Sequence, residues 1–438
     1  MYYSSFYHYL IGSVRMGIGI GIVSLLARWI TGNTIFSSPE AIIKYGIFGG
    51  IGYALMGVIA LMVFGKLGLI ARKDYPGGKT LGDYLYYKLH PAGYWLMIGI
   101  LIILSISCLI GQGIGAGILL NIFFDMPLLI GLIFSILFCI VYAGIGGAVW
   151  IQRLEGFQVF FIFTAAIFIP VYYFIQEGVE NIYLGIQLYH PYLLILNNYE
   201  SLFYVFTGMI IGFGQIISDL VTWQRLYMIK KKKVIPTFLL AGLIWFAFPL
   251  AFSSFFMIVI FTGGFDGTYS LWLELSQKLN SSSLLITIFF LCAFSAITST
   301  YGAVLHSLIG LIVKNVYQIR KPYVGEKEKI KTGHTLSLFI GGLSITFILL
   351  FDIKNIKFLF FFGDIFAAII APILVIIFSR GKVDNFIPFS SLIGFGVGYC
   401  SQLFVGELYS VWISAATSFL SILVYILFKK ANKVFKSV

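Results

Sequence analysis

Charged side chains are scarce in this sequence of 438 residues, because Asp, Glu, Lys and Arg together make up only 11% of it. Soluble proteins carry about 25% charged residues, whereas this chain has 60% hydrophobic residues and a mean hydropathy of +0.98. Apolar stretches of about 20 residues, each long enough to cross a hydrocarbon core about 30 Å thick, recur from end to end. The composition therefore excludes a water-soluble fold and predicts an all-α polytopic membrane protein.

Cysteine is also rare, and its four occurrences are single residues inside apolar spans: Cys108, Cys139, Cys292 and Cys400. No C-x-x-C pair is present, so they are interpreted as small core residues rather than disulfides or metal ligands. Catalytic signatures such as H-E-x-x-H, a phosphate-binding loop or G-x-S-x-G are missing as well. We therefore expect neither an enzyme nor an organic cofactor.

Hydropathy and loop residues predict twelve spans, near 13–45, 47–70, 94–121, 126–149, 155–177, 201–223, 234–261, 284–313, 335–351, 356–379, 387–406 and 408–428. Both termini then lie on one side. Of the 29 Lys and Arg residues, 24 fall on that side, four on the opposite side, and Arg28 within a span. Because cytoplasmic loops are enriched in Lys and Arg, we expect cytoplasmic termini in the plasma membrane. The net charge of +12 then orients the protein and does not indicate a nucleic-acid partner.

Polar residues interrupt the first span in the stretch SLLARWITGNTIFSSPE, residues 24 to 40. Ser38 as N-cap, Pro39 at the first helical position and Glu40 in the first turn form a helix-start signal. A start signal inside a span predicts two half-helices joined by an unwound stretch around 30–37. Unpaired backbone inside a membrane is tolerated only where it lines a cavity or binds something, so this break is a candidate site.

The sixth span contains a second interruption, in the stretch TGMIIGFGQIISDLVTWQR. If the first ten spans form two inverted repeats of five, spans one and six occupy matching positions. Interrupted segments at matching places in two halves indicate the substrate site of a transporter. The alternative is that glycines such as Gly212 only permit close packing of helices.

The eighth span carries a local pattern of hydroxyl residues, AFSAITSTYGAVLHS. Ala296, Ser299 and Thr300 stand at positions i, i+3 and i+4, so they share one helix face. Two hydroxyls and a backbone carbonyl suit a hard cation, which takes oxygen ligands. The alternative is that the hydroxyls only bond back to the carbonyl one turn earlier.

Five separated stretches resemble the sodium/solute symporter family, a branch of the LeuT-type inverted-repeat transporters: WITGNTIFSSPEAIIKYG, KTLGDYLYYKLHP, GGAVWIQRLEGFQ, SDLVTWQR and AITSTYGAVLHS. The resemblance covers roughly residues 8–320. It implies a single membrane domain over 1–438, with a ten-helix core of two inverted five-helix repeats at 13–380. Two peripheral helices at 387–428 complete it, and we expect it to function as a monomer.

The resemblance also implies a function and an ion site. The function is sodium-coupled symport of a small organic solute, with proton coupling, or a non-transporting sensor or channel, as alternatives. The expected Na⁺ ligands are main-chain oxygens of Ala27, Ile30 and Ala296 and the hydroxyls of Ser299 and Thr300. Glu155 matches an acid of the family pattern, with a role in the exit of the ion or as a partner of Arg153 or Arg225.

The remaining charges within spans require a partner or a role, because each costs about 2.5–3.5 kcal/mol at the centre of a span. Arg28 either holds a substrate carboxylate as a bidentate fork or pairs with Glu155 or Asp219. Asp219 is expected to stabilise the inner end of span six. Asp364 has no assigned role, and a pairing with Lys357 is the plain interpretation.

We therefore expect the substrate to be a small organic acid or zwitterion, such as a monocarboxylate or an amino acid. It should bind near the midplane, between the two interrupted spans. The expected substrate-binding residues are Arg28, Trp29, Thr31, Asn33 and Thr34 in span one, and Gly212 and Gln215 in span six.

Overall fold

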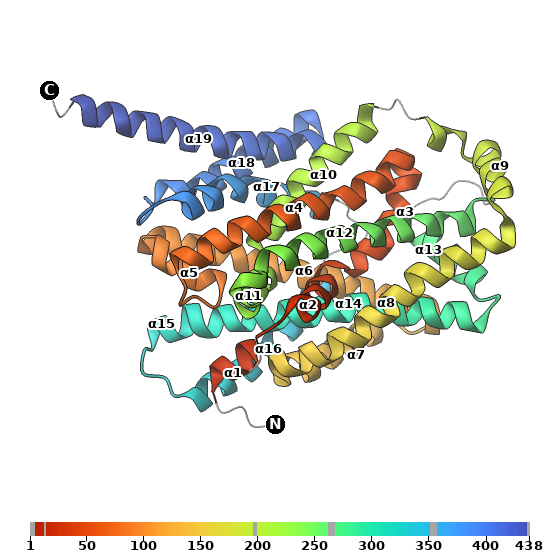
Figure 1. Cartoon of the computed structure of the whole chain (residues 1–438), viewed down its shortest axis with the longest axis horizontal. Coiled ribbons are helices and arrows are strands. Elements are labelled where there is room, and N and C mark those ends of the chain that lie inside the picture. Colours follow the sequence, from red (N-terminus) through yellow and green to blue (C-terminus); the bar gives the residue numbers. More distant parts are fainter. Residues whose placement is uncertain (1–4, 13–14, 196–198, 262–267, 351–356, 436–438) are drawn as a thin grey trace.

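The computed structural model describes the chain except for residues 1–4, 13–14, 196–198, 262–267, 351–356 and 436–438 (Figure 1). The described residues are mostly helical, and none of them forms an extended strand. Eleven of their helices are long and apolar enough to cross a membrane, and a bent pair of helices brings the number to twelve. The all-α polytopic fold and the expected number of spans are therefore confirmed.

The bent pair consists of α2 (Ile18–Trp29) and α3 (Gly32–Tyr45). The other spanning helices are α4 (Ile47–Asp74), α6 (Pro91–Phe124), α7 (Leu128–Cys139) continued by η1 (Ile140–Ile145), α8 (Gly147–Glu177), α10 (Tyr199–Ser218), α12 (Val234–Ser253) continued by η4 (Ser254–Val259), α14 (Ser283–Ile312), α16 (Glu326–Leu350), α17 (Lys357–Phe378), α18 (Phe386–Val405) and α19 (Glu407–Phe435). Shorter helices connect them: α1 (Phe6–Ile11), α5 (Leu81–Lys88), α9 (Val179–Tyr189), η2 (Pro191–Leu194), α11 (Leu220–Met228), η3 (Lys231–Lys233), α13 (Thr268–Leu279), η5 (Val313–Tyr317) and α15 (Gln318–Arg320).

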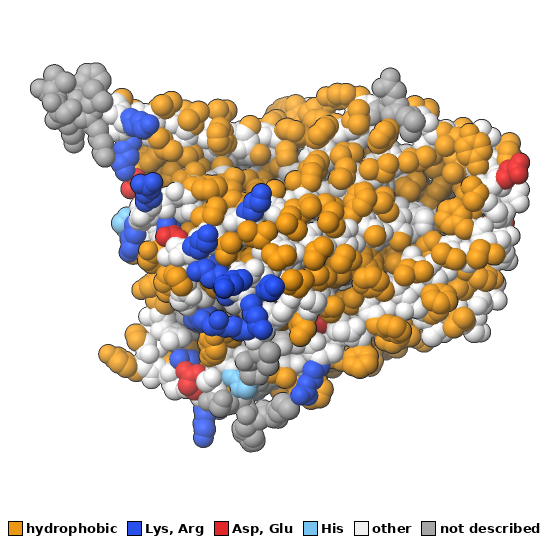
Figure 2. Space-filling view, in the orientation of Figure 1, with side chains coloured by type: hydrophobic (Ala, Val, Ile, Leu, Met, Phe, Trp, Pro, Cys, Tyr) orange, Lys and Arg blue, Asp and Glu red, His pale blue; other side chains and the backbone are white. Residues whose placement is uncertain are grey.

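The spanning helices form one bundle, and the last three lie together along one edge of it (Figure 1). Helix α17 packs against both α18 and α19, and it reaches the rest of the bundle mainly through α10, with a smaller contact to α4. Lys and Arg side chains gather near one end of the visible face, where α5, α11 and α15 lie, whereas hydrophobic side chains predominate over the remainder (Figures 1 and 2). This distribution matches an apolar belt in contact with lipid, and the side of the membrane occupied by the basic end stays a prediction.

The first span is broken between α2 and α3, which meet at an angle of 62°. Thr31 caps α3, because its hydroxyl accepts the Thr34 N–H at 3.1 Å and the Thr34 hydroxyl accepts the Thr31 N–H at 3.2 Å. The expectation of a restart at Ser38 and Pro39 is therefore wrong, since Pro39 lies inside α3. The unwound stretch is short because this capping box satisfies the backbone N–H groups several residues earlier than the Ser-Pro pair could.

The sixth span is broken at Asp219, which separates α10 from α11 and has an extended backbone. Its carboxylate accepts hydrogen bonds from the Thr222 N–H at 2.7 Å and the Thr222 hydroxyl at 2.5 Å, as an N-cap does. Gly212 and Gln215 lie inside α10, before the break. Gly212 is pressed against α4, since a Cβ there would come within 2.5 Å of the Met56 carbonyl oxygen. The packing interpretation of this glycine is thus the one that its surroundings support.

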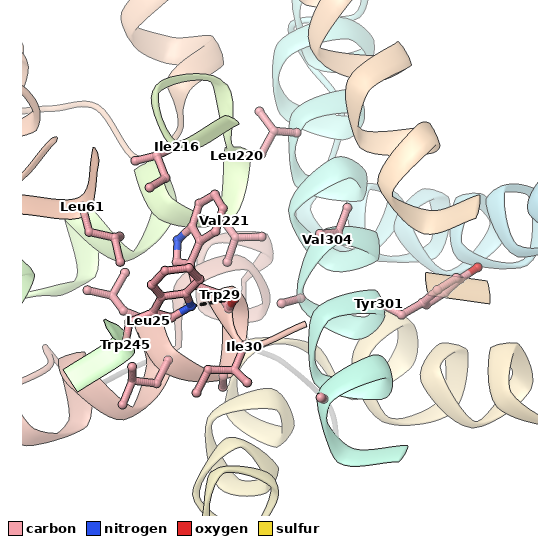
Figure 3. Packing of buried hydrophobic residues seen from close by; sticks show 14 of the residues in the cluster. Leu25, Trp29, Ile30, Leu61, Ile216, Leu220, Val221, Trp245, Tyr301 and Val304 are labelled. Carbon is pink, nitrogen blue, oxygen red and sulfur yellow. Dashed lines mark hydrogen bonds between the residues drawn. The ribbon is translucent and has the colours of Figure 1, made fainter. Parts of the chain in front are cut away.

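Aromatic side chains fill the space around the first break (Figure 3). The Trp245 indole donates to the Trp29 carbonyl at 2.9 Å, and the Trp29 indole donates to the Thr222 hydroxyl at 3.0 Å. The Gln112 side chain accepts the Gly32 N–H at 3.0 Å. The bonds from Trp245 and to Gln112 occupy backbone groups that the interrupted helix leaves free, which is the requirement for unwound backbone within a membrane.

Candidate functional site

Oxygen atoms from two helices meet where α2 ends beside the middle of α14. The Ser299 hydroxyl lies 2.9 Å from the Ala27 carbonyl oxygen and 3.1 Å from the Ala296 carbonyl oxygen. The Thr300 hydroxyl lies 3.4 Å from the carbonyl oxygen of Arg28. All these residues are buried. Among the described hydrogen bonds none joins the Ile30 carbonyl to this cluster, and the Arg28 carbonyl faces Thr300 instead.

The chemistry of this oxygen cluster suits a small hard cation. Its donors are neutral hydroxyl and carbonyl oxygens, and the free carbonyls lie at the C-terminal end of α2, where the helix dipole is negative. Among the described residues, no three His, Cys, Asp or Glu side chains group together as metal ligands do. A hydroxyl that donates to a carbonyl, as Ser299 does, can turn its lone pairs towards an ion, so the arrangement permits ion binding and requires none.

A cavity of about 1270 Å³ opens beside the cluster, between the two broken spans and helices α4 and α6. Its lining includes every residue that the sequence predicts to bind substrate: Arg28, Trp29, Thr31, Asn33, Thr34, Gly212 and Gln215. The five predicted ion ligands are outside the described lining, so they lie behind the cavity wall. Sequence reasoning missed other lining residues, among them Gln112, Tyr53 and Trp245, which come from helices without any interruption.

An ion pair inside the cavity connects the two breaks. Arg28, in the last turn of α2, donates to the Oδ1 atom of Asp219 from Nη2 at 2.7 Å and from Nε at 3.1 Å. The Arg28 side chain is 8% exposed and that of Asp219 is 7% exposed. The guanidinium also lies 4.9 Å from the Trp29 ring centroid, and its Nη2 atom is 3.9 Å from the Cys108 sulfur. Of the two acids considered from the sequence, Asp219 is therefore the partner of Arg28.

A second buried ion pair lies away from the cavity. Arg225 of α11 donates from Nη2 to the Oε1 atom of Glu155 at 2.6 Å, and both side chains are nearly inaccessible. Neither residue is among the described lining. Glu155 lies inside α8, which begins at Gly147, so the boundary expected near residue 155 was eight residues too late. The structure therefore places Glu155 in a helix-to-helix pair.

Comparison with known proteins gives two kinds of similarity, in sequence and in fold. A sequence model of the sodium:solute symporter family matches residues 9–382. Probable urea active transporter 2 of Schizosaccharomyces pombe is 24% identical over 372 residues, which cover 74% of this chain and 53% of that protein. Probable urea active transporter 1 of the same yeast is 20% identical over 372 residues, covering 77% and 55%. The chain thus spans about half the length of the curated relatives it matches.

Solved transporter structures share the fold of this chain. A Na⁺-coupled sialic acid symporter in a substrate-bound outward-open state has a TM-score of 0.75 at 14% identity, covering 95% of this chain and 91% of that one. Mhp1, a nucleobase-cation-symport-1 family transporter in a closed conformation, has a TM-score of 0.63 at 13% identity, covering 97% and 94%. MhsT in complex with L-phenylalanine has a TM-score of 0.61 at 14% identity, covering 95% and 99%. Likeness at such low identity shows the fold alone, and it confirms the expected LeuT-type architecture.

Proposed function

The chain belongs to the sodium:solute symporter family, a family of multi-pass membrane transporters, and from this premise we propose that it imports a small organic solute together with Na⁺. The observation that carries the proposal is the oxygen cluster at the end of α2, where the Ser299 hydroxyl approaches the carbonyls of Ala27 and Ala296. Those atoms are ligands of the type that Na⁺ requires. The transported ion would bind there, with Thr300 and the unwound backbone of the break completing its shell.

Coupling between ion and solute follows from the position of the ion site. Ala27, an expected Na⁺ ligand, directly precedes Arg28, which lines the cavity. An ion that holds the end of α2 against α14 would therefore also hold Arg28 and Trp29 in position for the solute. Because coupling between two binding sites is reciprocal, the solute would raise the affinity for Na⁺ by the same factor.

The charges of the cavity disfavour a solute with a net negative charge. Arg28 and Asp219 neutralise each other, and Glu407, in the first turn of α19, is the other charged residue among the described lining. A monocarboxylate would compete with Asp219 for the guanidinium and leave one negative charge unmatched. An amino acid can replace the pair with two pairs of its own, carboxylate to Arg28 and ammonium to Asp219. A zwitterion is therefore our first candidate within the class expected from the sequence.

A neutral amide such as urea is the second candidate solute. The names of the two curated relatives suggest it, and the amide side chains of Gln112, Gln215 and Asn33 in the lining offer donors and acceptors that match it. Urea would bind without separating Arg28 from Asp219. Competition assays distinguish the two candidates. An excess of the unlabelled true solute should block the uptake of its labelled form, and an excess of the other candidate should not.

We further propose that the protein functions as a monomer in the plasma membrane with both termini cytoplasmic. The support for this orientation is the excess of Lys and Arg at one end of the molecule (Figure 2). Labelling of single cysteines introduced into the tail after α19 tests it, because an impermeant reagent should react with them only after the cells are opened.

Uptake by purified protein in proteoliposomes tests the coupling ion. A Na⁺ gradient should drive uptake, and Ser299→Ala, which removes the central hydroxyl, should raise the Na⁺ concentration for half-maximal uptake about tenfold or more, as expected for about 1.5–3 kcal/mol of lost contact to a charge. Thr300→Ala should act in the same direction. Thr287→Ala is the matched control, because its hydroxyl bonds only to the Ser283 carbonyl of the same helix. Uptake that responds to a proton gradient and ignores Na⁺ would overturn the assignment.

A further inference from the structure

Asp364 is an acid in the middle of an apolar helix, and the transport site does not use it. The residue lies in α17 and is completely buried. An ionised carboxylate in such surroundings is costly unless a cation pairs with it. The described Lys, Arg and His side chains include none that forms an ion pair with it. Lys357, the partner expected from the sequence, begins α17 two turns earlier, about 10 Å along the axis, and its side chain lies outside the described residues.

Two serines of α19 face the Asp364 carboxyl group. The Ser410 hydroxyl lies 2.8 Å from its Oδ1 atom and also 2.8 Å from the Glu407 carbonyl oxygen, so its one hydrogen is shared between the two acceptors. Ser414, one turn later on the same helix face, lies beside the same carboxyl group. The Oδ2 atom of Asp364 and the Ser414 hydroxyl are both buried, and both lack a hydrogen-bond partner among the described residues. Orphaned buried polar atoms are rare and costly in native structures.

A hydrogen bond between Oδ2 and the Ser414 hydroxyl satisfies both groups, and because no described cation pairs with this buried acid, the acid rather than the serine supplies the hydrogen atom. We propose that Asp364 is a proton-binding site, in which the neutral carboxylic acid carries its proton on Oδ2 and donates it to the Ser414 hydroxyl while Oδ1 accepts from Ser410. The acid then forms one donated and one accepted hydrogen bond, both to α19. The bound proton therefore fastens α17 to α19 without placing a charge in the membrane.

The packing around Ser414 favours a proton over a metal cation. A Cβ atom at Gly398 of α18 would lie 1.7 Å from the Ser414 hydroxyl oxygen, and one at Gly394 would lie 2.6 Å from the Ser414 carbonyl oxygen. The glycine backbone therefore closes against the serine and leaves no room for a hydrated ion. A hard cation would also need more oxygen ligands than one carboxyl group and two hydroxyls supply.

Among the described residues, no titratable group on the helices packed against α17 supplies a counter-charge to Asp364. Glu407 precedes Ser410 on α19 by one turn and lines the cavity, and as an acid it cannot serve as a counter-charge for Asp364. Tyr204 of α10 and Tyr53 of α4 line the cavity, and the ring of Tyr399 of α18 packs 5.4 Å from that of Phe361. No described hydrogen bond links these groups to Asp364.

The proton site connects to the cavity through α17 itself. Phe362, Gly363 and Phe366 of this helix line the cavity, while Asp364 points to α19. Loss of the proton at alkaline pH would leave an unpaired negative charge between α17 and α19 and would separate the two helices. Uptake should consequently decline as the pH rises, through the movement of this wall.

Infrared difference spectroscopy of the full chain in lipid tests for the proton directly. The carbonyl stretching band of a protonated carboxylic acid should be present at neutral pH and lost in Asp364→Asn. Asp384→Asn is the control and should leave that band unchanged, because Asp384 is a surface acid paired with Lys429. Asp364→Asn keeps both hydrogen bonds in amide form, so it should transport at neutral pH and lose the decline at alkaline pH.

A second variant keeps the proposal testable if Asp364→Asn does not fold. Ser414→Ala removes the acceptor of the proton, so the band of the protonated acid should persist but shift to the position of a less strongly hydrogen-bonded carboxyl. If the protein lacks a protonated-acid band that depends on Asp364, the acid is ionised and the proposal is wrong. Na⁺-dependent thermal stabilisation that disappears in Ser414→Ala would equally overturn it, because the site would then hold a metal cation. Neither result would affect the Na⁺ site at Ser299.

Discussion

The two buried arginine–carboxylate pairs differ in their surroundings although their chemistry is the same. Both involve α11: Asp219 caps its first turn and pairs with Arg28 of α2, and Arg225 in its last turn pairs with Glu155 of α8. The acid at the N-terminal end and the base at the C-terminal end both complement the helix dipole. Only the Arg28–Asp219 pair lines the cavity. We infer that the enclosed pair is structural and the cavity pair is available for exchange with a solute.

The largest effect should come from breaking the enclosed pair. Arg225→Met leaves Glu155 buried without a counter-charge, which typically costs about 3–5 kcal/mol of stability. We expect a large decrease in the thermal midpoint of the purified protein, or a failure to accumulate in the membrane. The double variant Arg225→Met with Glu155→Leu removes both charges and should recover most of this loss. Equal stability of the single variant and the unmodified protein would contradict a structural role.

Breaking the cavity pair should reduce stability less and transport more. In Arg28→Gln the Asp219 carboxylate keeps its hydrogen bonds from Thr222 and can be reached by water in the cavity, so the remaining charge is partly compensated. Uptake of a zwitterionic solute should be lost while the protein folds and inserts, as measured by uptake and thermal unfolding on the same preparation. If this variant unfolds as readily as Arg225→Met, the inference that only the enclosed pair is structural is wrong.

The sequence could predict the spans and the pairing candidates but not the geometry of the breaks. Long apolar stretches and the alternation of basic loops determine the number of spans, because each must cross the same hydrocarbon thickness. The break in span one begins where the sequence predicts it, near residue 30, but the second half-helix restarts several residues earlier than predicted. A Ser-Pro start signal is local, whereas the Thr31 capping box acts together with Gln112 of α6. Gly212 illustrates the same limit, because a glycine in a packed helix and a glycine in a break look alike in sequence.

Contacts between helices that are distant in the sequence also determine which of the predicted site residues meet, and the sequence does not show these contacts. Arg28 had two candidate acids in the sequence, Glu155 and Asp219, and only the relative placement of α2, α8 and α11 distinguishes them. The same limit applies to the expected ion ligands. Spacing along α14 predicts that Ser299 and Thr300 share a face, but the carbonyl that Thr300 meets depends on how α2 unwinds, and it is that of Arg28.

Thiol labelling measures how accessible the cavity around Arg28 is to solvent, which is the difference that we infer between the two ion pairs. Cys108 lines the cavity beside Arg28, whereas Cys139 and Cys292 are buried away from it. A small polar thiol reagent should therefore inhibit transport partially, at a rate that bound solute decreases. Cys108→Ser should abolish the inhibition. Equal inhibition of that variant would mean that the reagent acts elsewhere and that the Arg28 side of the cavity is closed.

The smallest loss of stability should come from breaking an ion pair at the surface, which serves as a reference for the two buried pairs. Asp384, in the loop before α18, pairs with Lys429 and accepts a hydrogen bond from the Tyr425 hydroxyl at 3.1 Å. The hydrogen bond from Lys429 lowers the pKa of Asp384 below its ordinary value. A lowered pKa of an acid adds stability above its unfolded pKa of about 3.9, and that stability is lost as the pH falls through the folded value.

Exposure to solvent and salt makes the surface contribution small at neutral pH. Asp384→Asn should therefore decrease the thermal midpoint only slightly near pH 7, and the difference from the unmodified protein should shrink as the sample is acidified or the salt concentration is raised. Paired thermal unfolding series over pH and salt measure this. A difference that grows on acidification would show that the unmodified carboxylate destabilises the fold, contrary to the pairing. If the thermal midpoint decreased as much as in Arg225→Met, burial would not explain the difference in stability that these ion pairs contribute.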